Sequence, residues 1–258
     1  MKDRVIIVTG AATGIGRETA LRLGRRGARV VCVTDSNVAG GEETARLIRD
    51  AGGEAAFCRC DVACEAQVKA MVAFAVEKYG RLDGAFNNAG VGPDGVRMPF
   101  CGLTELSVEL WDRTMEVNAR GVFLCMKHEI PAMLQSGGGA IVNTASVGGL
   151  RMAPNFGAYG PSKAAVVAVT RAAALEFARR GIRANAVCPG PTMGTELMKN
   201  SLTSGGEAAG GDEGLPIPLG KPGRTEDVAN AVIWLLSDEA GHITGHALSV
   251  DGGMADIG

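Results

Sequence analysis

The sequence lacks a surplus of basic residues and has few histidines. Its 28 acidic residues outnumber its 26 lysines and arginines, and no basic cluster is present, which argues against a nucleic-acid-binding protein. Cys58, Cys60 and Cys64 lie close together but without a nearby histidine, so we expect no zinc or other metal site. No metal-ligand spacing relates the three histidines, which are His128, His242 and His246.

The sequence also lacks a long apolar run and a leader-like amino terminus. Met1 is followed almost at once by a predicted core strand, without the charged region and apolar stretch of a secretory signal. The seven cysteines are an odd number scattered over predicted strands and helices, which indicates reduced thiols rather than disulfides. We therefore expect a cytoplasmic protein that does not span a membrane.

Short apolar strand-like segments alternate with helical segments along the chain. This alternation predicts an α/β fold with a doubly wound parallel sheet and helices on both faces. No repeat or Pro/Ser-rich linker divides the 258 residues, so we expect a single domain over 1–258. The predicted helices lie near residues 40–51, 65–78, 106–134, 159–179 and 225–236.

A glycine-rich turn follows the first predicted strand, residues 4–8. Gly10, Gly14 and Gly16 lie between this strand and a predicted helix, where backbone N–H groups and the helix dipole favour a pyrophosphate. The spacing Gly-x-x-x-Gly-x-Gly departs from the common Gly-x-Gly-x-x-Gly fingerprint. Taken alone, such a turn also fits a strand and helix that need glycine for close packing.

Asp35 ends the next predicted strand, residues 28–34. A carboxylate about 20 residues after the glycine turn accepts hydrogen bonds from a ribose 2′-hydroxyl and repels a 2′-phosphate, so Asp35 favours NAD over NADP. The alternative is a simple turn residue. Arg17, in the first turn of the preceding helix, faces either solvent or a phosphate, and we favour solvent.

Tyr159 and Lys163 are four residues apart in a predicted helix and lie on one face of it. A phenol titrates near pH ~10, so a tyrosine that acts as a base near neutral pH needs about 4 kcal/mol of preference for phenolate. One cation about 5 Å away contributes roughly 3 kcal/mol at an effective dielectric of about 20. The alternative is an ordinary exposed helical pair.

From Arg4 to about Gly253 the sequence resembles the short-chain dehydrogenase/reductase family. The resemblance implies a Rossmann-type domain with about seven parallel strands in the order 3-2-1-4-5-6-7. Its motifs recur in order as Thr9 to Gly16, Asp61 with Val62, Asn87 to Gly90, Asn118, Ser146, Tyr159 with Lys163, and Pro189 with Gly190.

The resemblance implies roles for four catalytic residues. Tyr159 would be the acid/base, and Ser146 would hydrogen-bond the substrate oxygen. Lys163 would lower the pKa of Tyr159 and bind the nicotinamide ribose, while Asn118 would hold a water that links Lys163 to solvent. Without the family motifs, Ser146 reads as a loop serine or helix cap, and Asn118 as a polar residue inside a helix.

The resemblance also implies an NAD site. Asp61 and Val62 would contact the adenine, although Asp61 equally fits a cap of the helix starting near Cys64. Four residues past Gly190 the family usually has a threonine that holds the carboxamide, but here Gly194 lies between Thr192 and Thr195, so either hydroxyl is a candidate. The cofactor residues are Gly10, Thr13, Gly14, Ile15, Gly16, Asp35, Asp61, Val62, Asn88, Ala89, Gly90, Tyr159, Lys163, Pro189, Gly190, Thr192 and Thr195.

The segments expected to line the substrate pocket are 91–101, 147–156 and 192–222, and they are mostly apolar. They favour a hydrophobic or alicyclic secondary alcohol, although some of these side chains also fit plain loop packing. We expect a substrate flap at about 192–222. Residues 201–214 within it are rich in Gly, Ser and acidic residues, so we expect this part to be mobile. The expected substrate contacts are Ser146, Met152, Asn155, Tyr159 and Met193.

Three functions fit these patterns. The first is an NAD-dependent dehydrogenase of a secondary alcohol. The second is a 3-oxoacyl-[acyl-carrier-protein] reductase that uses NADPH, but such enzymes usually carry a basic residue where this chain has Leu134 to Gly137. The third is a non-catalytic dinucleotide-binding regulator, which would not need an intact catalytic set.

Two predicted helical segments, Trp111 to Met133 and Val166 to Ala178, are apolar around much of their circumference. Such helices are buried on more than one side. The chain's own sheet covers one side, and either lateral helices or a partner subunit cover the other. We expect the partner subunit, in a homotetramer as is common in the family, and no nucleic-acid or membrane partner.

Overall fold

The structure is a computed structural model that describes residues 1–34, 37–96, 98–203 and 217–255. Its main sheet is seven-stranded and parallel, with the strand order β3-β2-β1-β4-β5-β6-β9. This confirms the predicted order, since β9 is the seventh strand of that sheet. The strands are β1 (Val5–Thr9), β2 (Arg29–Thr34), β3 (Glu54–Phe57), β4 (Gly84–Asn87), β5 (Gly139–Thr144), β6 (Ile182–Pro189) and β9 (Ala247–Val250).

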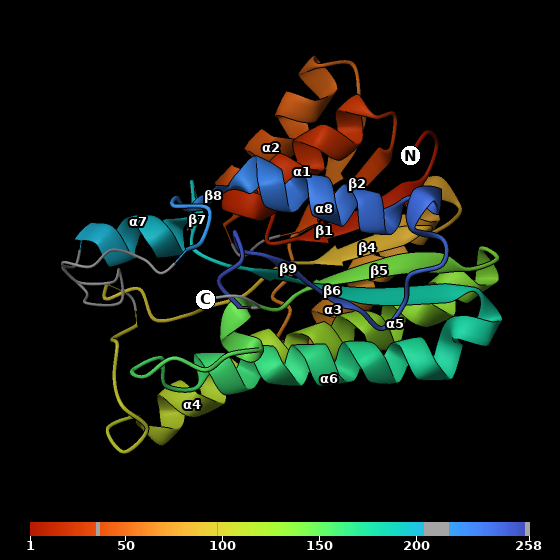
Figure 1. Ribbon diagram of the computed structural model, residues 1–258. Coiled ribbons are helices and arrows are strands. Elements are labelled where there is room, and N and C mark those ends of the chain that lie inside the picture. The colour runs from red at the N-terminus through yellow and green to blue at the C-terminus, as the bar shows by residue number, and fades with distance from the viewer. Residues whose placement is uncertain (35–36, 97, 204–216, 256–258) are drawn as a thin grey trace.

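Helices cover both faces of the sheet (Figure 1). On one face lie α1 (Gly14–Arg25), α2 (Val38–Asp50) and α8 (Thr225–Leu236), and on the other lie α3 (Glu65–Tyr79), α5 (Gly121–Gln135) and α6 (Tyr159–Phe177). Strand β1 shows why two cores form, because its side chains alternate between the faces. Ile6 and Val8 enter the core with α1, and Val5 and Ile7 enter the core with α3.

The predicted helix over 106–134 is interrupted. It consists of α4 (Val108–Met115), a π-helical turn (Glu116–Arg120) and α5. The single-sequence pattern misses this turn because all three pieces share a helical apolar period. A π-helical turn inside a helix often marks a functional site, and this one contains Asn118.

The region expected to form a flap is partly ordered secondary structure. Strand β7 (Thr192–Met193) pairs in parallel with β8 (Gly223–Arg224), and helix α7 (Glu196–Thr203) follows β7. Figure 1 shows these three elements together at one end of the molecule, beyond the main sheet. Within the expected flap, residues 201–203 are therefore helical, and residues 204–214 lie outside the described part of the chain.

No helix among the described residues is long and apolar enough to cross a membrane.

Candidate active site

The glycine-rich turn joins β1 to α1 at the carboxyl edge of the sheet. Gly10 and Gly14 have φ values of 65° and 57°, a left-handed conformation that glycine adopts readily. A Cβ on Gly16 would lie 2.2 Å from the Gly10 carbonyl oxygen, so this position admits glycine alone. Thr13 precedes α1 and its side chain caps no helical N–H group. The first turn of α1 therefore keeps donors for an anion, which fits a pyrophosphate.

Hydrogen bonds connect the carboxyl ends of β1, β4 and β5 beside this turn. The Thr9 hydroxyl accepts hydrogen bonds from the N–H groups of Asn88 and Ala89 at 2.9 and 3.1 Å. The Asn88 amide donates to the Gly10 carbonyl at 3.2 Å, and the Thr144 hydroxyl donates to the Asn88 amide oxygen at 3.2 Å. These bonds fix the Asn88–Gly90 segment against the turn. The sequence identified this segment but gave no signal for the role of Thr144.

Lys163 and Tyr159 lie next to each other, as predicted from their spacing. The Lys163 ammonium is 5.7 Å from the centroid of the Tyr159 ring and donates a hydrogen bond to the Thr144 carbonyl at 2.8 Å. Lys163 is only 3% exposed. The exposed helical pair considered above is thus wrong, because helix α6 turns this face toward the end of β5.

Ser146 follows β5 by two residues and is buried at the same place. Its hydroxyl accepts a hydrogen bond from the Gly148 N–H at 3.1 Å, and it lies close enough to the Tyr159 phenol to lower the pKa of that group. A serine and a tyrosine hydroxyl this close together fit the predicted pair that would bind one substrate oxygen. The helix-cap interpretation of Ser146 is also confirmed, because this hydroxyl caps the short 3-10 helix Val147–Gly149.

Asn118 is fully buried, and its side chain is committed to the protein. Its amide oxygen accepts from the Val91 N–H at 2.8 Å, and its amide nitrogen donates to the Val91 carbonyl at 2.8 Å and to the Ser162 hydroxyl at 3.0 Å. A Cβ on Gly90 would lie 3.1 Å from the Asn118 oxygen and 3.2 Å from the Lys163 nitrogen. Asn118 thus joins the loop after β4 to α6, directly beside Lys163.

The electrostatics of the cofactor-free site oppose the neutral-pH base that we expected. Burial raises the pKa of Tyr159, and the hydrogen bond with Ser146 offsets only part of this effect. Burial also lowers the pKa of Lys163 to about 8. Both shifts reflect the poor solvation of a buried charge. Protein groups alone therefore do not make the tyrosine acidic here.

The other predicted cofactor residues lie on the same edge of the sheet. Pro189 ends β6, and Gly190 follows it so closely packed that a Cβ would lie 2.8 Å from Asp251. Val62 is buried against Gly121. Asp61 accepts a hydrogen bond from the Ala63 N–H at 3.0 Å, whereas the residue that caps α3 is Cys64. Asp61 therefore stabilises the turn and does not cap the helix.

Asp35 lies outside the described residues. The interpretation of Arg17 as solvent-facing is wrong, because the side chain is half-buried between two helices. It donates to the Thr44 hydroxyl at 2.9 Å and to the Gly40 carbonyl at 3.2 Å. Arg17 thus ties α1 to α2.

The two candidate threonines differ in position. Thr192 is buried and its hydroxyl donates to the Gly190 carbonyl at 2.9 Å. The Thr195 hydroxyl donates to the Thr192 carbonyl at 2.9 Å and accepts from the Met198 N–H at 3.2 Å. A Cβ on Gly14 would lie 3.6 Å from the Thr195 side chain, so Thr195 faces the glycine turn.

The predicted substrate residues are only partly brought together. Met152 and Met193 are half-exposed, and Met152 packs over Gly160 beside the tyrosine. Asn155 is exposed, with a φ of 64°, and its carbonyl accepts from the Cys101 N–H. Its described contacts are with the 101–102 segment and not with the tyrosine. The Phe156 ring, whose centroid is 6.3 Å from that of Tyr159, is closer to the reacting group.

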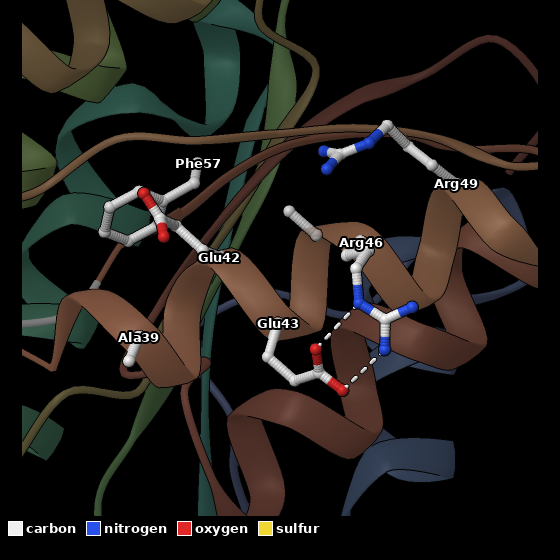
Figure 2. A pocket seen from close by; sticks show the side chains of 7 residues that line it. Ala39, Glu42, Glu43, Arg46, Arg49 and Phe57 are labelled. Atoms are coloured by element: carbon white, nitrogen blue, oxygen red, sulfur yellow. Dashed lines mark hydrogen bonds and ion pairs between the residues drawn. The ribbon is translucent and has the colours of Figure 1, made fainter.

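Another hollow, of about 550 Å³, lies between α2 and β3 (Figure 2). Its charged residues pair with each other, since Arg46 binds Glu43 with two hydrogen bonds at 2.9 Å and also binds Asp50. None of its lining residues belongs to the group around Tyr159. In the described ranges, no set of three His, Cys, Asp or Glu residues is arranged to hold a metal.

The chain is similar to known proteins over nearly its whole length. A family model described as enoyl-(acyl carrier protein) reductase matches residues 10–255. The chain is 41% identical, over 100% of its length and 99% of the relative, to 2,5-dichloro-2,5-cyclohexadiene-1,4-diol dehydrogenase of Sphingobium indicum. It is also 41% identical to cyclohexanol dehydrogenase of an Acinetobacter species, over 97% of this chain and 94% of the relative. The crystal structure of a levodione reductase matches with a TM-score of 0.91 at 34% identity, over 99% of this chain and 98% of that one.

Proposed function

Because this chain belongs to the short-chain dehydrogenase/reductase family, we propose that it transfers a hydride between NAD(H) and an alicyclic secondary alcohol or the corresponding ketone. The observation that carries this proposal is the contact group of Tyr159, Ser146 and Lys163 at the carboxyl edge, next to a glycine turn that fits a pyrophosphate. Open α/β sheets bind ligands at this edge.

In the proposed reaction, Tyr159 takes the proton of the substrate hydroxyl and Ser146 holds the same oxygen. When bound, the nicotinamide dinucleotide supplies the hydride acceptor. The raised pKa of Tyr159 means that positive charge must accompany its ionisation. Protonated Lys163 provides one such charge, worth roughly 3 kcal/mol at about 5 Å and an effective dielectric of about 20. The Asn118 amide is already occupied, so a water relay would use its main chain.

We assign NAD rather than NADP to the site. The position of Asp35 after β2 supports this choice, because a carboxylate there would repel a 2′-phosphate. Arg17 also supports it, because its guanidinium already donates to Thr44 and Gly40. Initial rates with NAD and NADP test the assignment, and a strong preference for NADP would overturn it. We further assign the carboxamide contact to Thr195, because it is the threonine that faces Gly14.

The alicyclic substrate class is supported by two independent points. Apolar side chains flank the Tyr159 ring, since Phe156 lies near it and Leu197 lies near the same added Cβ on Gly92 as the ring does. Two relatives at 41% identity are named as dehydrogenases of cyclohexanol and of a cyclohexadiene diol. A ring of six carbons therefore fits the chemistry of the pocket.

We also propose a homotetramer in the cytoplasm. Phe123 on α5 and Leu175 on α6 are 47% and 86% exposed, and a partner subunit would cover such apolar side chains. The six cysteines in the described regions are free thiols, as expected in a reducing compartment. Light scattering at micromolar protein tests the assembly, and a monomeric mass would count against it.

The central experiment compares the wild type with Tyr159→Phe. The wild type should oxidise cyclohexanol with NAD, read as NADH absorbance, and the variant should lose about 10³-fold in kcat while its NAD affinity stays within about twofold. Full activity in the variant would disprove the acid/base assignment. Reduction of acetoacetyl-coenzyme A with NADPH, without oxidation of any alicyclic alcohol, would favour the acyl-carrier-protein reductase instead.

A further inference from the structure

The loop after β4 is organised around a buried carboxylate, that of Asp94. Asp94 has no exposed surface. One of its carboxylate oxygens accepts hydrogen bonds from the N–H groups of Val96 and Met98 at 3.1 and 3.2 Å, and its own N–H donates to the Met98 carbonyl at 3.0 Å. These hydrogen bonds join Asp94, Val96 and Met98 closely to one another.

Helix α7 also contributes a donor to this carboxylate. The side-chain amide of Asn200 donates to the second oxygen of Asp94 at 2.8 Å. A hydrogen bond to a charged acceptor is stronger than one between neutral groups. This hydrogen bond connects residues that are 106 positions apart in the chain.

Helix α7 depends on such contacts. It has eight residues, and none of them is buried. An isolated helix of this length is not stable in water, and its start is capped within the segment itself by Thr195. Its orientation relative to the rest of the molecule therefore has to come from side chains on its inner face.

Leu197 lies on the same face as Asn200, because the two are three residues apart in α7. A Cβ placed on Gly92 would lie 2.9 Å from two carbons of the Tyr159 ring and 3.5 Å from the Leu197 side chain. Leu197 and the tyrosine ring therefore face each other across Gly92. Any shift of α7 changes the distance between them.

We propose that Asn200 is a specificity-determining positioning residue. Its hydrogen bond to Asp94 holds α7 so that Leu197 forms the apolar wall of the pocket opposite Tyr159, and this wall packs against the ring of an alicyclic substrate. The inference rests on the proposed function for its substrate class. It assigns substrate size selection to a polar pair that does not touch the substrate.

The test uses the full-length enzyme and three single variants. Asn200→Ala removes the hydrogen bond, Asn200→Asp sets a carboxylate against Asp94, and Lys199→Ala changes an exposed neighbour in the same helix. For cyclohexanol we expect KM to rise about tenfold in Asn200→Ala and further in Asn200→Asp, with kcat within about twofold. KM for 2-propanol, KM for NAD, and all constants of Lys199→Ala should stay within about twofold.

A reciprocal exchange separates this role from general damage. The double variant Asp94→Asn with Asn200→Asp restores an amide opposite a carboxylate, and its KM for cyclohexanol should fall back toward the wild-type value. A second readout is independent of turnover, because trypsin cleaves after Lys199 within α7. Cleavage there should be faster in Asn200→Ala than in the wild type, since a loosened helix opens more often.

Unchanged KM for cyclohexanol in Asn200→Asp would overturn the inference. An equal rise in KM for 2-propanol, or weaker NAD binding, would also overturn it, because either result indicates a merely structural residue. The proposed function fails separately, if the wild type itself oxidises no alicyclic alcohol. In that case, unchanged trypsin cleavage after Lys199 in Asn200→Ala would also reject the positioning of α7 by Asn200.

Discussion

Helix α6 carries Tyr159 and helix α7 lies close to the ring of this tyrosine, but the two helices are held in very different ways. Helix α6 has 19 residues, and its buried face carries Ser162, Lys163, Val166 and Thr170 into the core. Lys163 is bonded to the carbonyl at the end of β5. Helix α7 has eight residues, none of them buried, and the amide of Asn200 bonds it to the neighbouring loop.

This difference assigns the two helices different tasks. Proton transfer needs atoms placed within a fraction of an ångström, and in the proposed function the reacting groups lie on the helix that the core holds in place. In the same proposal, substrate shape is recognised by side chains on short segments above the sheet, where changes leave the core intact.

The largest effect is expected for Lys163→Met. Without the ammonium, Tyr159 loses its cationic neighbour, and kcat for cyclohexanol should fall roughly 10³-fold. Stability of the cofactor-free protein should change in the opposite direction. Burial lowers the pKa of Lys163 to about 8, so the fold holds the ammonium unfavourably at pH 7. After the loss of the hydrogen bond to Thr144, we expect a net gain of roughly 1–2 kcal/mol in the free energy of unfolding.

The pH dependence supplies the control for this variant. The folded-state pKa of Lys163 is lowered. The buried ammonium therefore destabilises the fold fully below about pH 8, and this cost disappears as pH rises above the ordinary lysine pKa. The stability advantage of Lys163→Met, measured by urea unfolding, should therefore shrink between pH 7 and pH 9.5. An advantage that grows over this range would show that the buried ammonium is not its source.

An intermediate effect is expected for Gly92→Ala, which changes the boundary between the two helices. The new methyl group would lie 2.9 Å from the Tyr159 ring and 3.5 Å from Leu197. The tighter contact is with the tyrosine, so kcat should fall roughly 10- to 100-fold and KM should change less. Steady-state kinetics with cyclohexanol measure both constants.

Gly102→Ala is the matched control, because a Cβ there meets nothing closer than 3.8 Å. Its kcat and KM should stay within about twofold of the wild type. If Gly92→Ala instead raises KM and leaves kcat unchanged, then α7 moves and the tyrosine does not. The difference in mobility between α6 and α7 would then be even greater than their hydrogen bonds indicate.

The sequence predicts the fold well because strand and helix periods dominate this chain. The run from Val5 to Thr9 and the glycine turn behind it identify β1 and α1 without any tertiary information. The positions of Tyr159 and Lys163 in one helical face follow from their spacing. These features are local, and local patterns are readable from a single sequence.

What the sequence could not give are contacts between distant segments. The π-helical turn that aims Asn118 at Val91 and Ser162 shares its apolar pattern with an ordinary helix. The bond between Asp94 and Asn200 has no period or motif that would reveal it. The pKa directions at Tyr159 and Lys163 depend on burial, which the spacing of the two residues does not determine.

The smallest effect on activity is expected in the packing beneath α6, at the buried Glu129. Its carboxylate accepts a hydrogen bond from Asn87 at 2.9 Å, and Asn87 continues through Asn143 to Thr170 on α6 with bonds of 3.0 and 2.8 Å. The other carboxylate oxygen of Glu129 has no hydrogen-bond partner among the residues that the structure describes. Burial raises the pKa of Glu129 to about 7, so the fold favours the neutral acid.

Glu129→Gln therefore tests separately how this buried carboxyl affects the stability of the protein and how it affects kcat. Because the folded-state pKa is raised, the stabilisation by the neutral acid is present at low pH and is lost as pH rises through about 7. The variant stays neutral, so urea unfolding should show equal stability at pH 5 and a gain of up to about 3 kcal/mol at pH 8. The exposed Glu239→Gln should show no such pH dependence, and kcat should stay within about twofold in both variants. A large loss of kcat in Glu129→Gln would mean that the hydrogen bonds from Glu129 to Thr170 help to position Tyr159 on α6.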